Sequence, residues 1–361
     1  MNLDIPTDSN VLIPPSPTGS RRSLLTPLPT PGHFLLVLDN TALEKIKRCP
    51  VMAENYLVHG REPHARNAAL TYGGAIHAGL EATLRGASYQ DACIAIQNFF
   101  ADNPSPPDEW RTPNVAMEVL GHYREWAQLP GNQWEILEDE NGPLIERAFE
   151  LPLGVLEVNA ELDFLKSGDR PAPSTYFVYQ IHLAWSGRID LIARFPNGSI
   201  RVVDHKTSSI SGTYAEQDFI QSFQLASQTM GYVWAARRLY PQIPVNGFAL
   251  NCLRLKKPTG SGNLTFPGPR GGDPVLKFFR NFYSYSDDRL AEWVDDTLAT
   301  IEDFVHCLVR SKFPHNDKQC FDKYGKCPYH DVCVEDNPRI RSNMLHSDMF
   351  KPVTWNPTEG R

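Results

Sequence analysis

The chain has 361 residues and carries 35 Lys and Arg against 42 Asp and Glu, a formal net charge of -7. This balance excludes a protein that binds nucleic acid through a global basic field, so any such binding must come from local patches. No apolar stretch reaches the roughly 18 residues that a membrane span requires, and the N-terminal residues lack the pattern of an export signal. We therefore expect a soluble, cytoplasmic protein without a membrane partner.

The composition changes along the chain and predicts its organisation. Residues 1–33 are rich in Pro, Ser and Thr and show little apolar periodicity, which is typical of a disordered or loosely docked arm. We expect a single domain over residues 34–335 and a polar tail over residues 336–361. Two amphipathic patterns within residues 86–130 indicate a helical insertion in this domain.

A helical pattern over residues 67–85 contains a candidate functional histidine, His77. Gly73 and Gly74 precede it by about one turn and would allow the helix to approach another backbone or a ligand closely. Taken alone, a surface helix on which His77 is merely polar explains this pattern at least as well.

Residues 185–209 are the most informative stretch, because they read as two strands joined by a turn at residues 196–198. Asp190 interrupts the first strand and Asp204 ends the apolar part of the second, where a buried acid costs several kcal/mol unless it is compensated. Lys206 projects to the same side as Asp204, since side chains alternate along a strand. Hard divalent cations prefer carboxylate oxygens, and an ammonium group can stabilise charge on a phosphate. These residues predict a centre for phosphodiester hydrolysis.

Downstream, residues 217–239 predict one continuous helix with an apolar stripe. Gln224, Gln228 and Tyr232 form a polar line on it at spacings of four residues. Residues 256–274 form a Gly, Pro and basic loop, which fits either disorder or a flap that contacts the substrate.

These motifs, in this order, resemble the RecB-like branch of the PD-(D/E)XK nuclease superfamily. The resemblance is carried by four segments: Gly73–His77 (GxxxH), Gly187–Asp190 (GRID), Val202–Thr207 (VVDHKT) and Gln228–Tyr232 (QxxxY). It implies a restriction-endonuclease-like α/β fold, in which a central mixed sheet is flanked by helices and carries helical insertions.

The resemblance also implies roles for individual residues. It implies that His77, Asp190 and Asp204 bind Mg²⁺ or Mn²⁺. It implies that Lys206 is catalytic, and that two further residues, Gln228 and Tyr232, support the lysine or contact the nucleic acid. Gln224 competes with Gln228 for this supporting role, and the sequence does not separate the two.

The implied activity is that of a metal-dependent deoxyribonuclease. We expect an exonuclease that acts on single strands or DNA ends, in DNA repair, recombination or the processing of phage or mobile-element DNA. The sequence leaves open the polarity of digestion, endonuclease action and a preference for RNA. No phosphate-binding GxxxxGK[ST] motif occurs, so a helicase or recombination partner would be a separate protein. The alternative is a non-catalytic nucleic-acid-binding or scaffold subunit with the same fold.

The chain contains seven cysteines, and this odd number without an export signal argues against a disulfide framework. Many of the nucleases that this chain resembles bind a [4Fe-4S] cluster through one cysteine before the histidine helix and three near the C-terminus. Cys49, Cys320, Cys327 and Cys333 are similar to that pattern. A local zinc site formed by the last three cysteines and His330 is the alternative. Either metal would be structural.

Overall fold

The structure, a computed structural model, describes residues 24–64, 68–104, 109–161, 176–257, 274–322 and 325–353. The chain divides into two compact units, each built from segments that are distant in the sequence. The first unit comprises residues 1–65, 148–187 and 294–360, and the second comprises residues 66–147, 188–293 and 361. The expectation of one nuclease domain over residues 34–335 stays a prediction.

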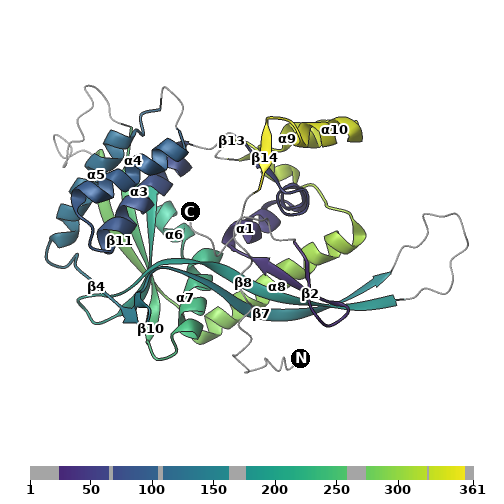
Figure 1. Ribbon diagram of the computed structural model, residues 1–361, viewed down its shortest axis with the longest axis horizontal. Coiled ribbons are helices and arrows are strands. Elements are labelled where there is room, and N and C mark those ends of the chain that lie inside the picture. Colours follow the sequence, from purple (N-terminus) through teal and green to yellow (C-terminus); the bar gives the residue numbers. More distant parts are fainter. Residues whose placement is uncertain are drawn as a thin grey trace, which may run out of the picture. The chain divides into compact units, whose positions relative to one another are not determined.

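The strands of the second unit form a mixed sheet, which the apolar alternation of their sequences predicts. Its members are β4 (Glu135–Ile136), the end of β8 (Tyr176–Arg194), β9 (Ile200–Ser208), β10 (Val245–Leu255) and β11 (Leu276–Ser284). Strands β8 and β9 are antiparallel, β9 and β10 are parallel, and β10 and β11 are antiparallel (Figure 1). Gly198 closes the predicted β8–β9 hairpin with a φ of 80°, a conformation that suits glycine. The sequence analysis did not assign β11.

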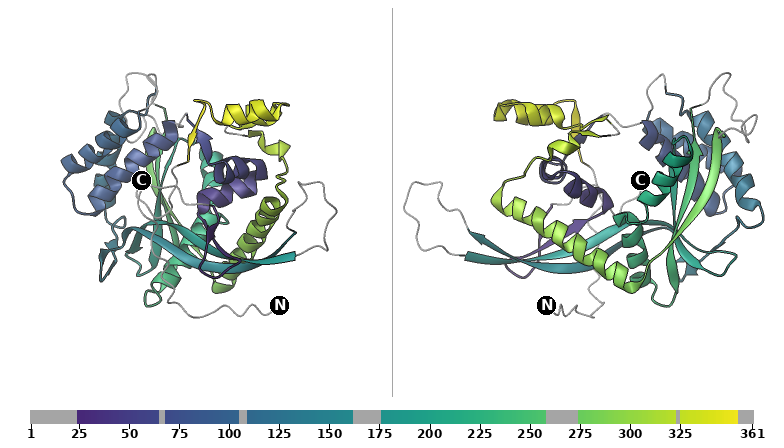
Figure 2. Two further views of the ribbon diagram at one scale, coloured as in Figure 1. Left: turned by 45° about the vertical axis from the view of Figure 1, so that its right-hand side comes forward. Right: turned by 180° about the vertical axis from the view of Figure 1, so that it is seen from behind.

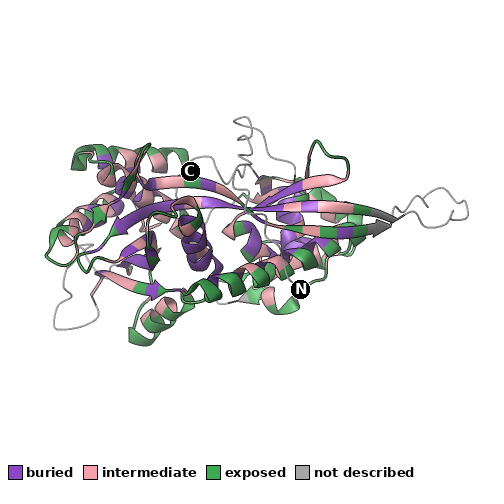
Figure 3. Ribbon diagram, turned by 90° about the horizontal axis from the view of Figure 1, so that it is seen from below, coloured by how far each residue is buried: buried purple, intermediate pink, exposed green. Residues whose placement is uncertain are grey.

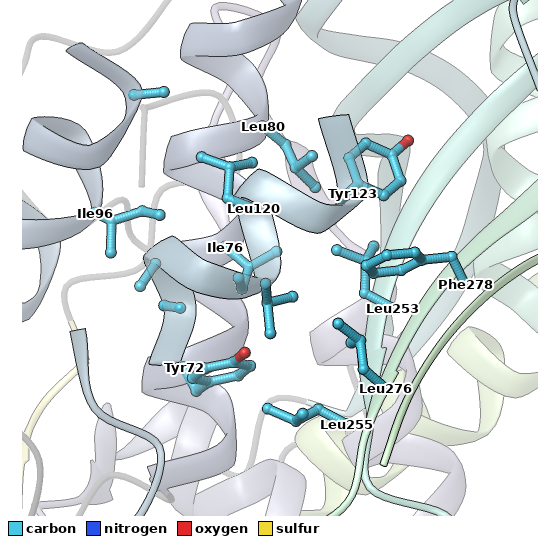
Figure 4. Close-up of a cluster of buried hydrophobic side chains, with 14 of the residues drawn as sticks. Tyr72, Ile76, Leu80, Ile96, Leu120, Tyr123, Leu253, Leu255, Leu276 and Phe278 are labelled. Atoms are coloured by element: carbon cyan, nitrogen blue, oxygen red, sulfur yellow. The ribbon is translucent and has the colours of Figure 1, made fainter. Parts of the chain in front are cut away.

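Helices cover this sheet. Helices α3 (Ala68–Leu84) and α5 (Pro113–Gln128) share a buried core with β10 and β11, α4 (Tyr89–Asp102) packs on α3 and α5, and α7 (Ser227–Leu239) contacts β9 and β10. Figure 4 shows the resulting core, in which Ile76 and Leu80 of α3 meet Leu120 of α5 and Leu253 and Phe278 of the sheet. The predicted architecture, a central mixed sheet flanked by helices, is confirmed.

The close approach of α3 and α4 depends on a glycine. A Cβ atom at Gly74 would lie 2.3 Å from the ring of Phe99 on α4, which is far inside the contact distance of two carbon atoms. The prediction that a glycine allows α3 to approach another element closely is therefore confirmed, and that element is a neighbouring helix.

The helix predicted over residues 217–239 is wrong in one respect, because the chain forms two helices, α6 (Thr213–Ser222) and α7. Side chains satisfy the carbonyl groups between them. Thr229 Oγ1 donates a hydrogen bond to the carbonyls of Phe223 and Ala226, and Tyr285 Oη donates to the carbonyl of Gln224 at 3.0 Å. At Phe223 and Gln224, these contacts replace the backbone hydrogen bonds that a continuous helix would make.

The first unit begins within the predicted disordered arm. Strand β1 (Thr26–Pro27) pairs with β2 (His33–Leu38), which in turn pairs in parallel with β8, so this part of the arm docks on the sheet. Residues 1–23 lie outside the described residues. Strand β7 (Ile145–Glu161) also pairs with β8. More residues of both strands are exposed toward the end of β7 and the beginning of β8 (Figure 3).

Short helices and strands complete this unit. They are α1 (Asn40–Arg48), α2 (Pro50–Ala53), the π-helix η1 (Glu54–Val58), β3 (Arg61–Pro63), α8 (Asp287–Arg310), η3 (Asp317–Gln319), β12 (Phe321–Asp322), β13 (Gly325–Lys326), α9 (His330–Val334), α10 (Pro338–Leu345) and β14 (Phe350–Pro352). The first seven residues of α8 belong to the second unit. The described part of the predicted polar tail, up to residue 353, contains α10 and β14, and β14 pairs with β3 (Figure 2). Most of the loop predicted over residues 256–274 lies outside the described residues.

Candidate active site

Two buried carboxylates form the centre of the second unit. Asp190 lies near the end of β8 and is 5% exposed, and Asp204 lies on β9 and is 1% exposed. Leu191 pairs with Val203 in the antiparallel ladder, so Asp190 and Asp204 are opposite each other one step further along it. The hairpin therefore brings together two acids that are 14 residues apart in the sequence.

The carboxylate of Asp204 has two polar neighbours. Lys206 Nζ lies 2.7 Å from Asp204 Oδ2 as an ion pair, and Gln228 Nε2 of α7 donates to Asp204 Oδ1 at 3.2 Å. Burial raises the pKa of Asp204 most strongly, the Lys206 ammonium lowers this pKa, and the nearby Asp190 raises it again. The charged form of Asp204 is therefore costly here, and a further cation would stabilise it.

His77 reaches the same place from helix α3. Its Nδ1 lies 3.4 Å from Asp190 Oδ2, and its Nε2 lies 2.7 Å from the backbone carbonyl oxygen of His205. The backbone N–H of His205 donates to Asp190 Oδ2 at 3.0 Å. A Cβ atom at Gly73 would lie 3.0 Å from Thr207 Oγ1, so this glycine allows α3 to approach β9 closely. The structure thus brings the GxxxH helix to the two acids.

A residue that the sequence analysis missed, Glu146, is part of this group. His77, Glu146 and Asp190 each offer a ligand atom, and these three atoms lie within 4.8 Å of one another. Among the residues that the structure describes, Asp204 does not belong to this group of three. Arg188 Nη1 lies 3.9 Å from Glu146 Oε2. Two carboxylates and a histidine are a suitable donor set for a hard divalent cation.

The sequence carried only a weak signal for Glu146. It follows Leu144 and Ile145, which are both buried, so an acid stands directly after two core residues. Its backbone has a φ of 50°, although it is not glycine and lies inside β7. Alternation along a regular strand does not predict such a turn of the backbone.

The structure separates the two candidate glutamines. Gln228 contacts Asp204, whereas Gln224 lies in the break between α6 and α7 with an exposed side chain. Tyr232 is buried one turn beyond Gln228 on α7. Gln228 therefore has the better geometry for a supporting role.

Behind the acids, the side chain of His205 enters a buried polar network. Asn251, its neighbour on β10, donates through Nδ2 to His205 Nδ1 at 2.8 Å and to Tyr123 Oη at 2.9 Å. Arg280 Nε donates to Asn251 Oδ1 at 2.9 Å, and the Arg280 guanidinium lies 3.9 Å from the ring centroid of Trp134. Because an amide nitrogen only donates, His205 Nδ1 must accept, which fixes the neutral tautomer with its proton on Nε2.

This environment opposes a charged His205. Burial lowers the pKa of His205 to about 3, and the charges of His77, Arg280 and Lys206 act in the same direction, while Asp190 acts against it. The backbone of His205 contacts both His77 and Asp190, so the network on its side chain holds the part of β9 that faces the acids.

The four cysteines of the predicted cluster belong to the first unit. Cys49, Cys327 and Cys333 pack against a buried apolar cluster that includes Met52 and Tyr329. Burial and the neighbouring thiols raise the pKa of Cys327, and the same effects raise the pKa of Cys333 to about 11. These contacts place the cysteines near one another.

Their ligand atoms, however, do not form a compact metal site. Among the residues that the structure describes, no three of the four cysteines and His330 have ligand atoms within 4.8 Å of one another. Thiolates around one tetrahedral zinc ion would be about 3.8 Å apart, as follows from Zn–S bonds of about 2.3 Å. The structure therefore supports neither the local zinc site nor the iron-sulfur prediction.

Comparisons with known proteins give the family. The model of the PD-(D/E)XK nuclease superfamily matches residues 40–334. Similar solved structures include a "Putative exonuclease" from Eubacterium rectale (11% identity, 83% of this chain and 88% of that chain, TM-score 0.42) and SSO0001 (14% identity, 72% and 84%, TM-score 0.19). Both scores are too low to carry an argument. No curated protein matches this chain. In the part of the chain that the structure describes, no helix has the length and apolarity of a membrane span. The family match covers more than half of the sequence, and this chain therefore belongs to the PD-(D/E)XK nuclease superfamily.

Proposed function

We propose that this protein is a metal-dependent nuclease that hydrolyses DNA phosphodiester bonds, and that it acts as an exonuclease. One observation carries the proposal: two buried carboxylates, Asp190 and Asp204, face each other beside the ammonium group of Lys206. Membership of the nuclease superfamily supports phosphodiester hydrolysis and a DNA substrate.

The residues present fit a divalent cation, since the buried acids and His77 are oxygen and nitrogen donors in one place. His77, Asp190 and Asp204 would hold Mg²⁺ or Mn²⁺. The bound ion would supply a polarised phosphate and a more acidic water. Lys206 would place a positive charge beside the scissile phosphate. Gln228 orients Asp204, and the backbone N–H of His205 orients Asp190. Tyr232 would support this arrangement from within α7.

End-labelled single-stranded and double-stranded DNA tests the activity, with Mg²⁺ or Mn²⁺ and with 5′ or 3′ ends blocked. We expect wild-type protein to degrade DNA from an open end, and Asp204→Ala and Lys206→Ala to lose cleavage while they still bind DNA. Equal cleavage by these variants would refute the site. Binding without cleavage by wild-type protein would instead support the non-catalytic subunit.

The biological setting is proposed on the same basis. An exonuclease for single strands or DNA ends would serve DNA repair, recombination or the processing of phage or mobile-element DNA, with any helicase on a separate chain. Degradation that begins only at free ends supports this assignment, whereas cleavage of a closed circular substrate contradicts it.

The four-cysteine iron-sulfur cluster stays a prediction. Four thiols are a suitable donor set, and a cluster of four irons separates its ligands more widely than one zinc ion does. Iron and sulfide analysis of anaerobically purified protein tests it, with Cys252→Ser as a control for a buried cysteine outside the set. Iron that is lost in Cys49→Ser and kept in Cys252→Ser supports the cluster, and its absence from wild-type protein refutes it.

A further inference from the structure

We propose that Glu146 is a third carboxylate ligand of the active-site cation, and that Arg188 positions it. This inference rests on the proposed metal-dependent nuclease function and names a residue that the sequence motifs do not contain. It concerns three elements of the second unit: helix α3 supplies His77, strand β7 supplies Glu146, and strand β8 supplies Asp190.

The distances suit a single ion. One ligand atom from each of His77, Glu146 and Asp190 lies within 4.8 Å of the others. Ligands of an octahedral Mg²⁺ ion, at about 2.1 Å from it, are about 3.0 Å apart when adjacent and about 4.2 Å apart when opposite. Asp204 lies outside this set and is engaged by Lys206 and Gln228. The ion would therefore sit between three elements, and Asp204 would complete its carboxylate ligands from the side of Lys206 and Gln228.

The charges point the same way. The side chain of Glu146 is 13% exposed and that of Asp190 is 6% exposed, so water screens the repulsion between their carboxylates poorly. The guanidinium of Arg188 lies 3.9 Å from Glu146 Oε2, too far for a direct hydrogen bond but close enough to orient the carboxylate. A divalent cation between the two carboxylates would offset their mutual repulsion.

The backbone adds an independent property that can be measured. Glu146 has a φ of 50°, a left-handed conformation that side chains other than Gly, Asn and Asp adopt at a cost. Such strain persists where the surrounding structure or the function requires it. A ligand role therefore predicts that the metal-free protein loses no stability, and can gain some, when Glu146 is replaced by an uncharged residue that suits this backbone.

Two variants and one matched control test the proposal on the full chain. Glu146→Gln removes the charge at nearly constant size, and Glu146→Asn removes it while favouring the left-handed backbone. Glu157→Gln makes the same chemical change at an exposed position of the same strand. Mn²⁺ affinity is measured by electron paramagnetic resonance titration, and the melting temperature is measured with EDTA and with saturating Mg²⁺.

We expect both Glu146 variants to bind Mn²⁺ at least tenfold more weakly than wild-type protein and to lose most of the Mg²⁺-induced rise in melting temperature. Their melting temperature in EDTA should equal or exceed that of wild-type protein. Arg188→Gln should weaken Mn²⁺ binding by a smaller factor, and Glu157→Gln should match wild-type protein. Mn²⁺ affinity retained within threefold, or a lower melting temperature in EDTA for both Glu146 variants, overturns the proposal, as does failure of both to fold.

DNA cleavage measured in parallel separates this inference from the proposed function. If wild-type protein binds Mn²⁺ through Glu146 but cuts no DNA, the nuclease proposal falls and the ligand assignment stands. If wild-type protein cuts DNA and Glu146→Gln binds Mn²⁺ and cuts as well as wild-type protein does, the ligand assignment falls and the nuclease proposal stands.

Discussion

Acid should destabilise this protein through His205, and replacing that residue by asparagine should remove the effect. His205 is 2% exposed, and its Nδ1 accepts a hydrogen bond from the side-chain amide of Asn251. Protonation of Nδ1 would place two hydrogen-bond donors opposite each other in a buried environment, and this hydrogen bond would be lost. An asparagine at this position keeps an acceptor near Nδ1 but cannot titrate. It is smaller, so its absolute stability should be lower, and the informative quantity is the dependence on pH.

The magnitude follows from the two pKa values. The pKa of His205 is about 3 in the folded protein against a reference value of 6.5, so folding favours the neutral imidazole. The stability that this preference contributes is fully present above pH 6.5 and is lost as the pH falls from 6.5 toward 3. The slope approaches about 1.4 kcal/mol per pH unit, which amounts to about 2 kcal/mol between pH 7.5 and pH 5.

Urea denaturation in EDTA, followed by circular dichroism from pH 7.5 to pH 5, measures this difference. Both proteins share every other titrating group, so subtracting the two pH profiles isolates the contribution of residue 205. We expect the free energy of unfolding of wild-type protein to fall by about 2 kcal/mol more than that of His205→Asn. Parallel profiles would refute the buried neutral histidine and the network inferred around it.

Three further predictions follow from the site and the core. Asp204→Asn should abolish DNA cleavage yet raise the melting temperature in EDTA at neutral pH. The pKa of Asp204 is raised in the folded protein, so the stability that its protonated form contributes is lost as the pH rises through that pKa. A lower melting temperature of the variant would contradict this reasoning. Gln228→Ala should lower kcat about tenfold with little change in DNA binding, while Gln224→Ala serves as the matched control and should leave kcat unchanged; steady-state cleavage rates distinguish them. Gly74→Ala should destabilise the protein by about 1–3 kcal/mol, because the new methyl group would overlap the Phe99 ring, and Phe99→Leu in the same chain should recover part of this loss in thermal melts.

The sequence was sufficient to predict those contacts of the candidate site that depend on the spacing of residues within one strand, hairpin or helix. The β8–β9 hairpin fixes Asp190 opposite Asp204, and alternation along β9 fixes Lys206 beside Asp204, so the structure brings together what the motifs predicted. His77 also lies at the predicted place, because Gly73 and its helix can approach β9. These features need only strand and helix periodicity.

The sequence was insufficient where a distant residue determines the local conformation. The break between α6 and α7 is stabilised by a hydrogen bond from Tyr285, about sixty residues further along the chain. Phe350 is ordered by pairing with Pro63, and the strand that pairs with Thr26 is itself held by β8, contacts that composition does not encode. Glu146 joins the acids only through a left-handed backbone inside a strand.

The hydrogen bonds of the His205 backbone and side chain connect the candidate site to a tryptophan whose fluorescence can be measured. The backbone of this residue contacts His77 and Asp190, and its ring lies 6.1 Å from the ring of Trp134. Because Trp134 also stacks with Arg280, its indole occupies a polar and charged environment that depends on the position of β9. In the proposed metal-dependent nuclease, a movement of that strand on Mg²⁺ binding would change the emission of this indole. Trp134 would then serve as an intrinsic optical reporter of whether the proposed metal site is occupied.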